Sequence, residues 1–368
     1  MPNLLFCMTP GVGLNTWHKI GSLSRELKPY NEYVKRGWKV RILTFDRGPI
    51  PKLPEGITVV RFPNRRLLWF LPIVCGKLGR WADLIKTNQS MGSWYYTLAA
   101  KMWKKPVLLR CGYVHGEYLE AVGGRSLKSV AYQFLELVAF RSADYCQVPT
   151  KELSAWVQKR YGVNPSNINI VPNFVNTDIF QPLNGVEKIK KAIISVGRLE
   201  PVKRFDLLIG AAAKMPGASL TIVGAGSQKP RLKQMAKELN VSIDLPGNIA
   251  NEKLPELLSS HEIFVMTSAW EGHPKALIEA MACGLPAVVS ENTGTAGISE
   301  NGVNCLLAKP DMEDIKNKVT LLFNDRALYE DISRNARKFA CDNYSFEKIM
   351  LKEFSFLGKN EGFTFDSE

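Results

Sequence analysis

Two acidic residues lie eight positions apart in the segment EGHPKALIE, residues 271–279. The apolar run 263–266 precedes this segment and Gly284 follows it, which predicts a strand, a polar loop and a helix that ends near the glycine. Pro274 suits the first turn of such a helix, and the unpaired N–H groups at its start can bind an anion. The segment could therefore bind a phosphate and, through Glu271 and Glu279, accept hydrogen bonds from hydroxyls. A nucleotide sugar presents both kinds of group.

Cations and glycines follow other predicted strands. Arg198 and Lys203 come after the apolar run 192–196, and together they offer a planar fork and a mobile point charge for a diphosphate. Ligands of doubly wound domains bind outside the carboxyl ends of the strands, so these loops are candidate ligand contacts. The small or amide residues in the corresponding loops are Gly11, Gly13, Gly224, Gly247 and Asn248.

Short apolar runs alternate with helical patterns along the whole chain, which predicts parallel sheets covered by helices. We expect strands at 4–8, 40–45, 58–62, 83–87, 107–111, 145–149, 169–171, 192–196, 219–223, 242–245, 263–266 and 287–290. We expect helices at 15–36, 66–80, 92–103, 127–142, 151–161, 205–215, 229–239, 253–259, 275–283 and 311–323. A turn-rich stretch near residues 181–187 separates two such runs.

The fold class predicted from this pattern is α/β, with two Rossmann-like, doubly wound parallel-sheet domains at 1–185 and 186–345. A further helix and tail occupy residues 346–368; they could pack back on the first domain, and the tail is expected to be loosely ordered from Gly358.

The charge is unevenly distributed over the 368 residues. Residues 1–185 contain 25 Lys and Arg against 11 Asp and Glu, whereas residues 186–368 contain 23 against 24. A basic first half suggests an anionic partner, such as a membrane surface, a phosphorylated acceptor or nucleic acid; a basic but merely solvated surface is the alternative. The block 61–81 has cations around a Trp- and Leu-rich centre, which fits either a membrane-surface element or a core helix.

Localisation and redox state follow from the same sequence. The longest apolar uncharged run, 67–76, is too short to cross a membrane, and no signal peptide is evident. The seven cysteines form no C-x-x-C pair, which favours buried thiols in a reducing compartment. We expect a cytoplasmic protein that could associate peripherally with the membrane.

Four segments in chain order, 171–182, 196–203, 223–226 and 271–279, resemble the markers of the retaining family 4 glycosyltransferases (glycosyl transferases group 1) of the GT-B fold. The resemblance implies two domains that face each other across a cleft, the first binding an acceptor and the second a nucleotide sugar. The implied reaction is transfer of a sugar from a UDP- or GDP-linked donor to a glycan, lipid-linked or other cell-envelope acceptor.

The resemblance also implies roles for the candidate residues. Glu271 would hold the hydroxyls of the donor sugar, Glu279 would bind the ribose, and Arg198 and Lys203 would neutralise the diphosphate as the bond breaks. The remaining residues are implied donor contacts. Gly11 and Gly13 would let the first-domain loop approach the donor closely, Gly224 would form the turn on the nucleotide side, and Gly247 and Asn248 would lie where the base is held. The loop and helix start would contribute Gly272, His273, Lys275, Ala276 and Leu277.

Three positions leave alternatives open. His115 is a candidate catalytic residue near the donor sugar, but it follows its strand by several residues and could be a plain loop histidine, with Arg110 in its place. Glu279 taken alone could be an exposed helix carboxylate. Arg204 stands where the family usually has glycine, which puts the local loop geometry in question.

Other functions are less consistent with the sequence. There is no D-x-D triplet, so we expect no metal and no bound cofactor besides the nucleotide-sugar co-substrate. Three alternative functions on the same fold stay open: a nucleotide-sugar epimerase, a phosphorylase and a non-catalytic binding protein. A nicotinamide dehydrogenase is disfavoured because Gly11-Val-Gly13 lacks the third glycine of the fingerprint, and no nucleic-acid-binding module is recognisable.

Overall fold

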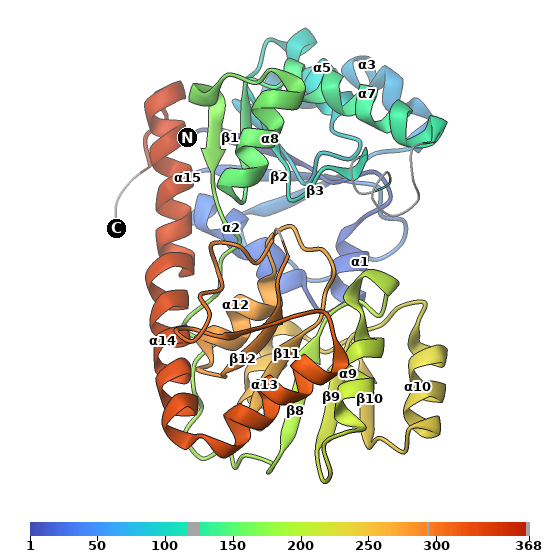
Figure 1. The fold of residues 1–368 in the computed structure, drawn as a ribbon. Coiled ribbons are helices and arrows are strands. Elements are labelled where there is room, and N and C mark those ends of the chain that lie inside the picture. Colours follow the sequence, from blue (N-terminus) through green and yellow to red (C-terminus); the bar gives the residue numbers. More distant parts are fainter. Residues whose placement is uncertain (117–118, 120–125, 293, 366–368) are drawn as a thin grey trace. The chain divides into compact units, whose positions relative to one another are not determined.

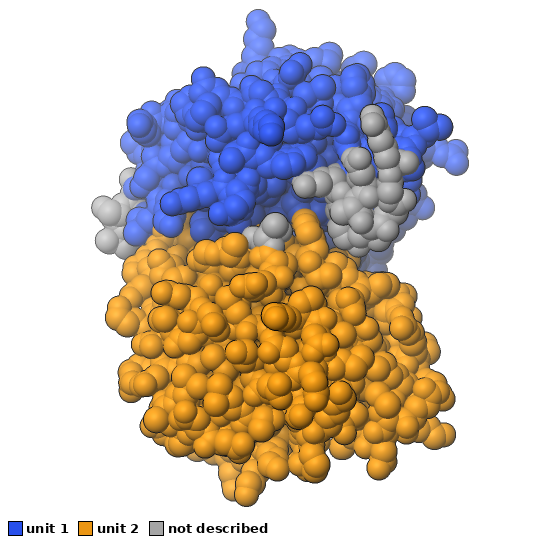
Figure 2. Space-filling view, in the orientation of Figure 1, with its two compact units in different colours: residues 1–172, 350–368 blue, residues 173–349 orange. Residues whose placement is uncertain are grey.

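The structure is a computed structural model that describes residues 1–116, 119, 126–292 and 294–365. The chain forms two compact units, shown in different colours in Figure 2. Unit 1 contains residues 1–172 and 350–368, and unit 2 contains residues 173–349. The division therefore falls thirteen residues before the boundary expected at 185, and the last segment of the chain returns to unit 1.

Unit 1 is built on a seven-stranded sheet in which every pairing is parallel, with strand order β3-β2-β1-β4-β5-β6-β7. Each predicted strand of the first half is present, within two residues of its expected bounds. The strands are β1 (Asn3–Cys7), β2 (Lys39–Thr44), β3 (Ile57–Arg61), β4 (Leu84–Thr87), β5 (Val107–Arg110), β6 (Tyr145–Val148) and β7 (Ile168–Ile170).

Helices cover both faces of this sheet (Figure 1). Alternation along β1 directs Leu5 and Cys7 to one face, where they pack with residues of α3, α4 and α5, and directs Phe6 to the other, where its ring lies 4.1 Å from that of Tyr30 in α2. The helices of unit 1 are α1 (Leu14–Lys19), α2 (Leu23–Lys35), η1 (Arg65–Phe70), α3 (Leu71–Val74), α4 (Gly76–Trp81), α5 (Trp94–Trp103), α7 (Leu127–Ser142), α8 (Lys151–Tyr161), η2 (Pro165–Asn167) and, from Met350, the end of α15 (Phe346–Glu361).

The single helix predicted at 66–80 is instead three short pieces, η1, α3 and α4. Pro72 lies in the first turn of α3, a position that tolerates its missing N–H but begins a new helix. The segment is therefore not one amphipathic helix.

The end of the chain is more ordered than expected. Helix α15 continues to Glu361, and the ring of Phe365 stacks on that of Trp38 at 5.3 Å with an interplanar angle of 9°. Inside unit 1, the buried carboxylate of Glu353 pairs with Lys86 and accepts a hydrogen bond of 2.6 Å from the Tyr33 hydroxyl. The prediction of a loose tail from Gly358 is wrong as far as Phe365, because the rings of Phe363 and Phe365 pack against the ring of Trp38.

Unit 2 has a six-stranded sheet, also parallel at every pairing, with strand order β10-β9-β8-β11-β12-β13. The five strands expected here are present, and β13 was not predicted. The strands are β8 (Ala192–Val196), β9 (Ser219–Val223), β10 (Ile243–Gly247), β11 (Ile263–Met266), β12 (Ala287–Ser290) and β13 (Leu306–Ala308).

The helices of unit 2 include one long element that the sequence analysis did not identify, α14, which packs against α12. They are η3 (Pro201–Lys203), α9 (Phe205–Ala212), α10 (Lys229–Glu238), η4 (Asn251–Lys253), α11 (Leu254–Ser259), α12 (Lys275–Ala282), α13 (Met312–Asn324), α14 (Arg326–Tyr344) and the start of α15. The buried strands β8, β11 and β12 lie in the middle of this sheet, and their carboxyl ends carry the candidate site.

Candidate active site

The loops after β8 and β9 pack tightly together. Gly224 has φ of +140°, and a Cβ there would overlap the carbonyl oxygen of Gly197. Its N–H donates to the Gly247 carbonyl at 2.8 Å, and the N–H of Gly197 donates to Val223 at 2.9 Å. Only glycine fits at position 224, because both the backbone angle and the space exclude a side chain. The predicted nucleotide-side turn therefore has a structural role in joining three strand ends.

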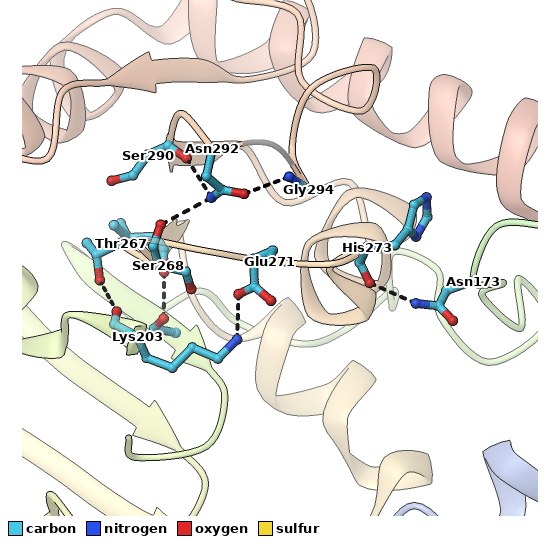
Figure 3. A network of polar contacts seen from close by, with 11 residues as sticks. Asn173, Lys203, Thr267, Ser268, Glu271, His273, Ser290, Asn292 and Gly294 are labelled. Atoms are coloured by element: carbon cyan, nitrogen blue, oxygen red, sulfur yellow. Dashed lines mark hydrogen bonds and ion pairs between the residues drawn. The ribbon is translucent and has the colours of Figure 1, made fainter. Parts of the chain in front are cut away.

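Lys203 and Glu271 meet although 68 residues separate them. The Lys203 ammonium lies 2.5 Å from Oε1 of Glu271, and both side chains are largely but not fully buried. Two hydrogen bonds hold these loops together. The Thr267 hydroxyl donates to the Lys203 carbonyl at 2.9 Å (Figure 3), and the Ala269 N–H donates to the Val202 carbonyl at 2.9 Å. The structure thus brings together one predicted cation and one predicted carboxylate of the site.

Asn292 supports the same loop and was not identified from the sequence. Its amide nitrogen donates to the carbonyls of Ser268 and Ser290 at 3.1 and 3.2 Å, and its Oδ1 accepts from the Gly294 N–H at 3.0 Å (Figure 3). Gly294 is equally constrained, because a Cβ there would overlap the Glu271 carbonyl group. The loop after β12 therefore supports the backbone that carries Glu271.

Helix α12 begins directly after the Glu271 loop, as predicted. Pro274 is its N-cap, with φ of −76° and ψ of 102°, rather than a residue of the first turn. The first hydrogen bond within the helix is donated by Ile278 to the Pro274 carbonyl at 3.4 Å. The N–H groups of Ala276 and Leu277, in the first turn, therefore have no acceptor within the helix, and this end of the helix is suited to bind an anion.

His273 anchors this loop rather than presenting its ring at the site. Its carbonyl accepts a 2.7 Å hydrogen bond from the Asn173 amide, and its ring lies 5.2 Å from that of Tyr344 in an edge-to-face arrangement. Nδ1 is buried and has no hydrogen-bond partner among the described residues. Burial and the neighbouring Lys275 charge lower the pKa of His273 to about 3, so the ring is neutral at physiological pH.

Glu279 is a buried carboxylate, so the alternative of an exposed helix residue is wrong. Only 2% of the residue is exposed, and Oε1 accepts a 3.0 Å hydrogen bond from the amide of Asn251, itself buried. A buried carboxylate needs such donors. Asn251 follows the strand that ends at Gly247, and no motif in the sequence marked it.

The other predicted residues of unit 2 lie in loops at the same edge of the sheet. Arg198 is exposed in the loop after β8, and Asn248 is exposed directly after β10. Gly247 has φ of +86° with open space around its Cα. Arg204 adopts φ of +49°, which explains physically why glycine would be favoured at this position.

In unit 1, the predicted glycines pack against the protein itself. A Cβ at Gly13 would overlap the carboxylate of Asp46, which accepts hydrogen bonds from the N–H groups of Leu14 at 2.6 Å and Asn15 at 3.2 Å. Gly11 has φ of +101° and lies near the Arg65 side chain. Gly13 is thus required for the approach of Asp46, a residue that the sequence analysis did not single out.

His115 lies in a turn held by a buried acid. Glu136 in α7 accepts hydrogen bonds from the N–H groups of His115 and Gly116 at 2.8 and 3.0 Å, and from the hydroxyls of Ser90 and Tyr161 at 3.3 and 3.4 Å. Burial raises the pKa of Glu136, an effect that these hydrogen bonds partly oppose. The turn is therefore fixed by its backbone. Burial and the charge of Lys128 lower the pKa of the His115 ring.

No group of three or more His, Cys, Asp or Glu among the described residues is arranged to hold a metal ion. No helix within the described ranges has the length and apolar character needed to span a membrane.

Family models account for most of the chain. Residues 177–339 match the model described as Glycosyl transferases group 1, and residues 30–179 match the model described as Glycosyltransferase Family 4. The chain is a group 1 glycosyltransferase of the family 4 type. The family predicted from the sequence is thereby confirmed.

Curated relatives of this glycosyltransferase carry the same activity in their names, which confirms the predicted enzyme class, a hexosyltransferase. It is 27% identical over 289 residues to an Escherichia coli UDP-Gal:alpha-D-GlcNAc-diphosphoundecaprenol alpha-1,3-galactosyltransferase, covering 73% of each chain. It is 31% identical over 206 residues to an uncharacterised glycosyltransferase of Haemophilus influenzae, covering 54% of this chain and 56% of the relative. The matched region thus spans about half of the second relative.

Solved structures confirm the GT-B fold. Sucrose-phosphate synthase from Thermosynechococcus elongatus superposes with a TM-score of 0.81 at 19% identity, covering 98% of this chain and 100% of the other. Anabaena HepE, solved in complex with UDP, gives a TM-score of 0.80 at 19% identity with the same coverage. Two parallel-sheet units are what this fold requires, and both are present.

Proposed function

We propose that this glycosyltransferase moves a hexose from a UDP- or GDP-linked donor to a lipid-linked or other cell-envelope glycan, with retention of anomeric configuration. The name of the Escherichia coli relative supports a UDP-hexose as donor and a lipid-diphosphate-linked sugar as acceptor. The observation that carries the proposal is the Lys203–Glu271 ion pair next to the start of α12 in unit 2.

Each part of this arrangement fits one part of the donor. Breaking a sugar–phosphate bond develops negative charge on the leaving diphosphate, which Lys203, the exposed Arg198 and the N–H groups at the start of α12 would stabilise. Glu271, which pairs with Lys203, would accept hydrogen bonds from sugar hydroxyls. Glu279, oriented by Asn251, would accept them from the ribose.

The proposed reaction needs no protein nucleophile. The bond between C1 of the hexose and the phosphate oxygen breaks, and a bond from C1 to the acceptor oxygen forms on the same face. The acceptor hydroxyl proton passes to the departing phosphate oxygen. We propose that no metal takes part, so excess chelator should leave the rate unchanged; a rate restored only by a divalent cation would contradict this. His115 as a donor-site residue belongs to the same proposal, and His115→Ala should then lower turnover.

The test measures acceptor-dependent release of nucleoside diphosphate after a panel of nucleotide sugars has been screened for thermal stabilisation. Glu271→Gln should lower kcat/KM by about 100-fold or more, and Lys203→Met should weaken donor binding by about 10-fold or more. Lys214→Met is the matched control, because Lys214 forms an exposed ion pair with Glu313 away from the site. Full activity in the Glu271 and Lys203 variants, or a product of inverted configuration, would contradict the proposal.

We further propose that the enzyme works in the cytoplasm, at the cytoplasmic face of a membrane, because a lipid-linked acceptor would reside there. The excess of cations in the first half of the chain supports an anionic membrane surface as partner.

A further inference from the structure

Unit 1 concentrates its large exposed apolar side chains on one layer of helices. Among the described residues, nine large apolar side chains are more than half exposed, and six of them lie on η1–α3, α5 and α7. We call these six the apolar layer; they are Trp69, Phe70, Ile73, Met102, Leu127 and Phe134, with exposures between 56 and 92%. Single exposed apolar side chains are common on protein surfaces, but a cluster of six large ones on neighbouring helices marks an interaction surface.

The three helical elements are neighbours, so the layer is one surface. Helix α5 packs against both α3 and α7, and the three lie together on unit 1 in Figure 1. The ring of Trp69 lies 4.7 Å from that of Tyr95 in α5, edge to face, which ties η1 to the same layer. The buried residues of α5 face the sheet, and Met102 therefore points outward.

Exposed cations flank the part of the apolar layer that lies on η1 and α3. No Asp or Glu occurs from Gly56 to Ala82, whereas Arg65, Arg66, Lys77 and Arg80 are all exposed there. None of these four forms an ion pair with another described residue. Their charges are thus available to a partner, and that partner should be anionic.

We propose that the apolar layer docks on an anionic lipid surface, with Trp69, Phe70 and Ile73 inserted among the lipids and Arg65, Arg66, Lys77 and Arg80 at the headgroups. Aromatic and aliphatic groups flanked by cations are the composition of interfacial elements. The segments η1, α3 and α4 have six, four and six residues, so they lie on a bilayer rather than cross it.

A second copy of the chain fits this surface less well. An isologous dimer would place the same patch of each copy against the other, and each set of four cations would then face an identical set. An anionic bilayer offers complementary charge to all four cations. The inference deepens the proposed function, which includes a lipid-linked acceptor. Its test measures binding and not transfer, so either idea can fail without the other.

The experiment is flotation of the full chain with vesicles of phosphatidylcholine alone or with one-third phosphatidylglycerol. The wild type should bind the anionic vesicles and not the neutral ones. Arg66→Gln with Arg80→Gln should lower the partition coefficient about 30-fold, since each cation near the surface contributes about 1 kcal/mol. The charge-matched control is Lys233→Gln with Lys237→Gln on the exposed face of α10 in unit 2, which should bind like the wild type.

A second pair of variants tests insertion. Phe70→Ser with Ile73→Ser should lower binding at least about 10-fold, whereas Leu239→Ser with Leu321→Ser, at exposed apolar positions of unit 2, should not. Vesicles with brominated acyl chains should quench tryptophan fluorescence in the wild type, and Trp69→Phe should remove that quenching while keeping a ring against Tyr95.

Binding that is indifferent to lipid charge, or equal losses in the layer variants and their controls, would overturn the inference. So would self-association of the wild type that Ile73→Ser abolishes, because it would assign the layer to a second copy.

Discussion

His273 should make unit 2 sensitive to acid, and replacing it with phenylalanine should remove that sensitivity. The ring is 8% exposed and packs edge to face on Tyr344, a contact that a phenylalanine ring can retain. Burial first, and the charge of Lys275 second, hold its pKa at about 3, against 6.5 for an unperturbed histidine. Because the folded pKa is the lower one, protonation favours the unfolded chain as the pH falls below 6.5.

The size of the effect follows from the two pKa values. At pH 7.5 the ring is neutral in both states and contributes almost nothing to the pH dependence. At pH 5 the unfolded chain binds a proton that the folded chain does not, which costs the folded state about 2 kcal/mol from this residue. The free energy of unfolding of wild type should therefore fall by about 2 kcal/mol more than that of His273→Phe between pH 7.5 and pH 5.

The assay is urea unfolding at both pH values, with circular dichroism and fluorescence transitions required to coincide. His261, whose pKa is also lowered by burial, is present in both proteins, so its contribution cancels in the difference. His18→Phe, at an exposed position, is the control and should match the wild type. The chain has only four histidines, so their ring resonances can also be followed directly by NMR with labelled histidine. An equal loss of stability in wild type and His273→Phe, or a His273 resonance that titrates near pH 6.5, would refute the reasoning.

Three further predictions concern the supports of the site. Gly294→Ala should displace the Glu271 backbone and lower kcat, and should lower the free energy of unfolding in urea by about 1–3 kcal/mol. Unchanged values would show that the loop after β12 can shift to accept a methyl group. Arg204→Gly should be more stable than Arg204→Ala by about 1 kcal/mol, because only glycine avoids the cost of φ at +49°; equal melting temperatures would count against backbone strain. Asn251→Ala should leave Glu279 without its amide donor, costing about 1–3 kcal/mol and raising KM for the donor; a variant with wild-type stability and KM would show that this hydrogen bond is dispensable.

The sheets and most helices could be predicted because their signals are local. The apolar runs of β8, β9, β11 and β12 match the observed strands residue for residue. One strand and one long helix were not predicted. Strand β13 has three residues, too few for a pattern, and α14 buries small alanines such as Ala336 and Ala340 on its inner face, which weakens the apolar periodicity.

The sequence by itself determined the fold class, the family and the order of the charged residues along the chain. These depend on periodicity and on motifs confined to single segments. It also placed Glu271 and Lys203 after strands of one sheet.

Only the tertiary structure decided which residues support these groups and which contact them. Asn292, Gly294, Asn251, Asp46 and Glu136 carry no motif, and each acts through partners that are distant in sequence or belong to another loop. A single polar residue has no periodicity, so its partner emerges only when the parallel strands align their carboxyl ends and bring those loops within hydrogen-bonding distance. For the same reason the exposure of Trp69, Phe70 and Ile73, in a block that could also have been a core helix, became evident only in the folded chain.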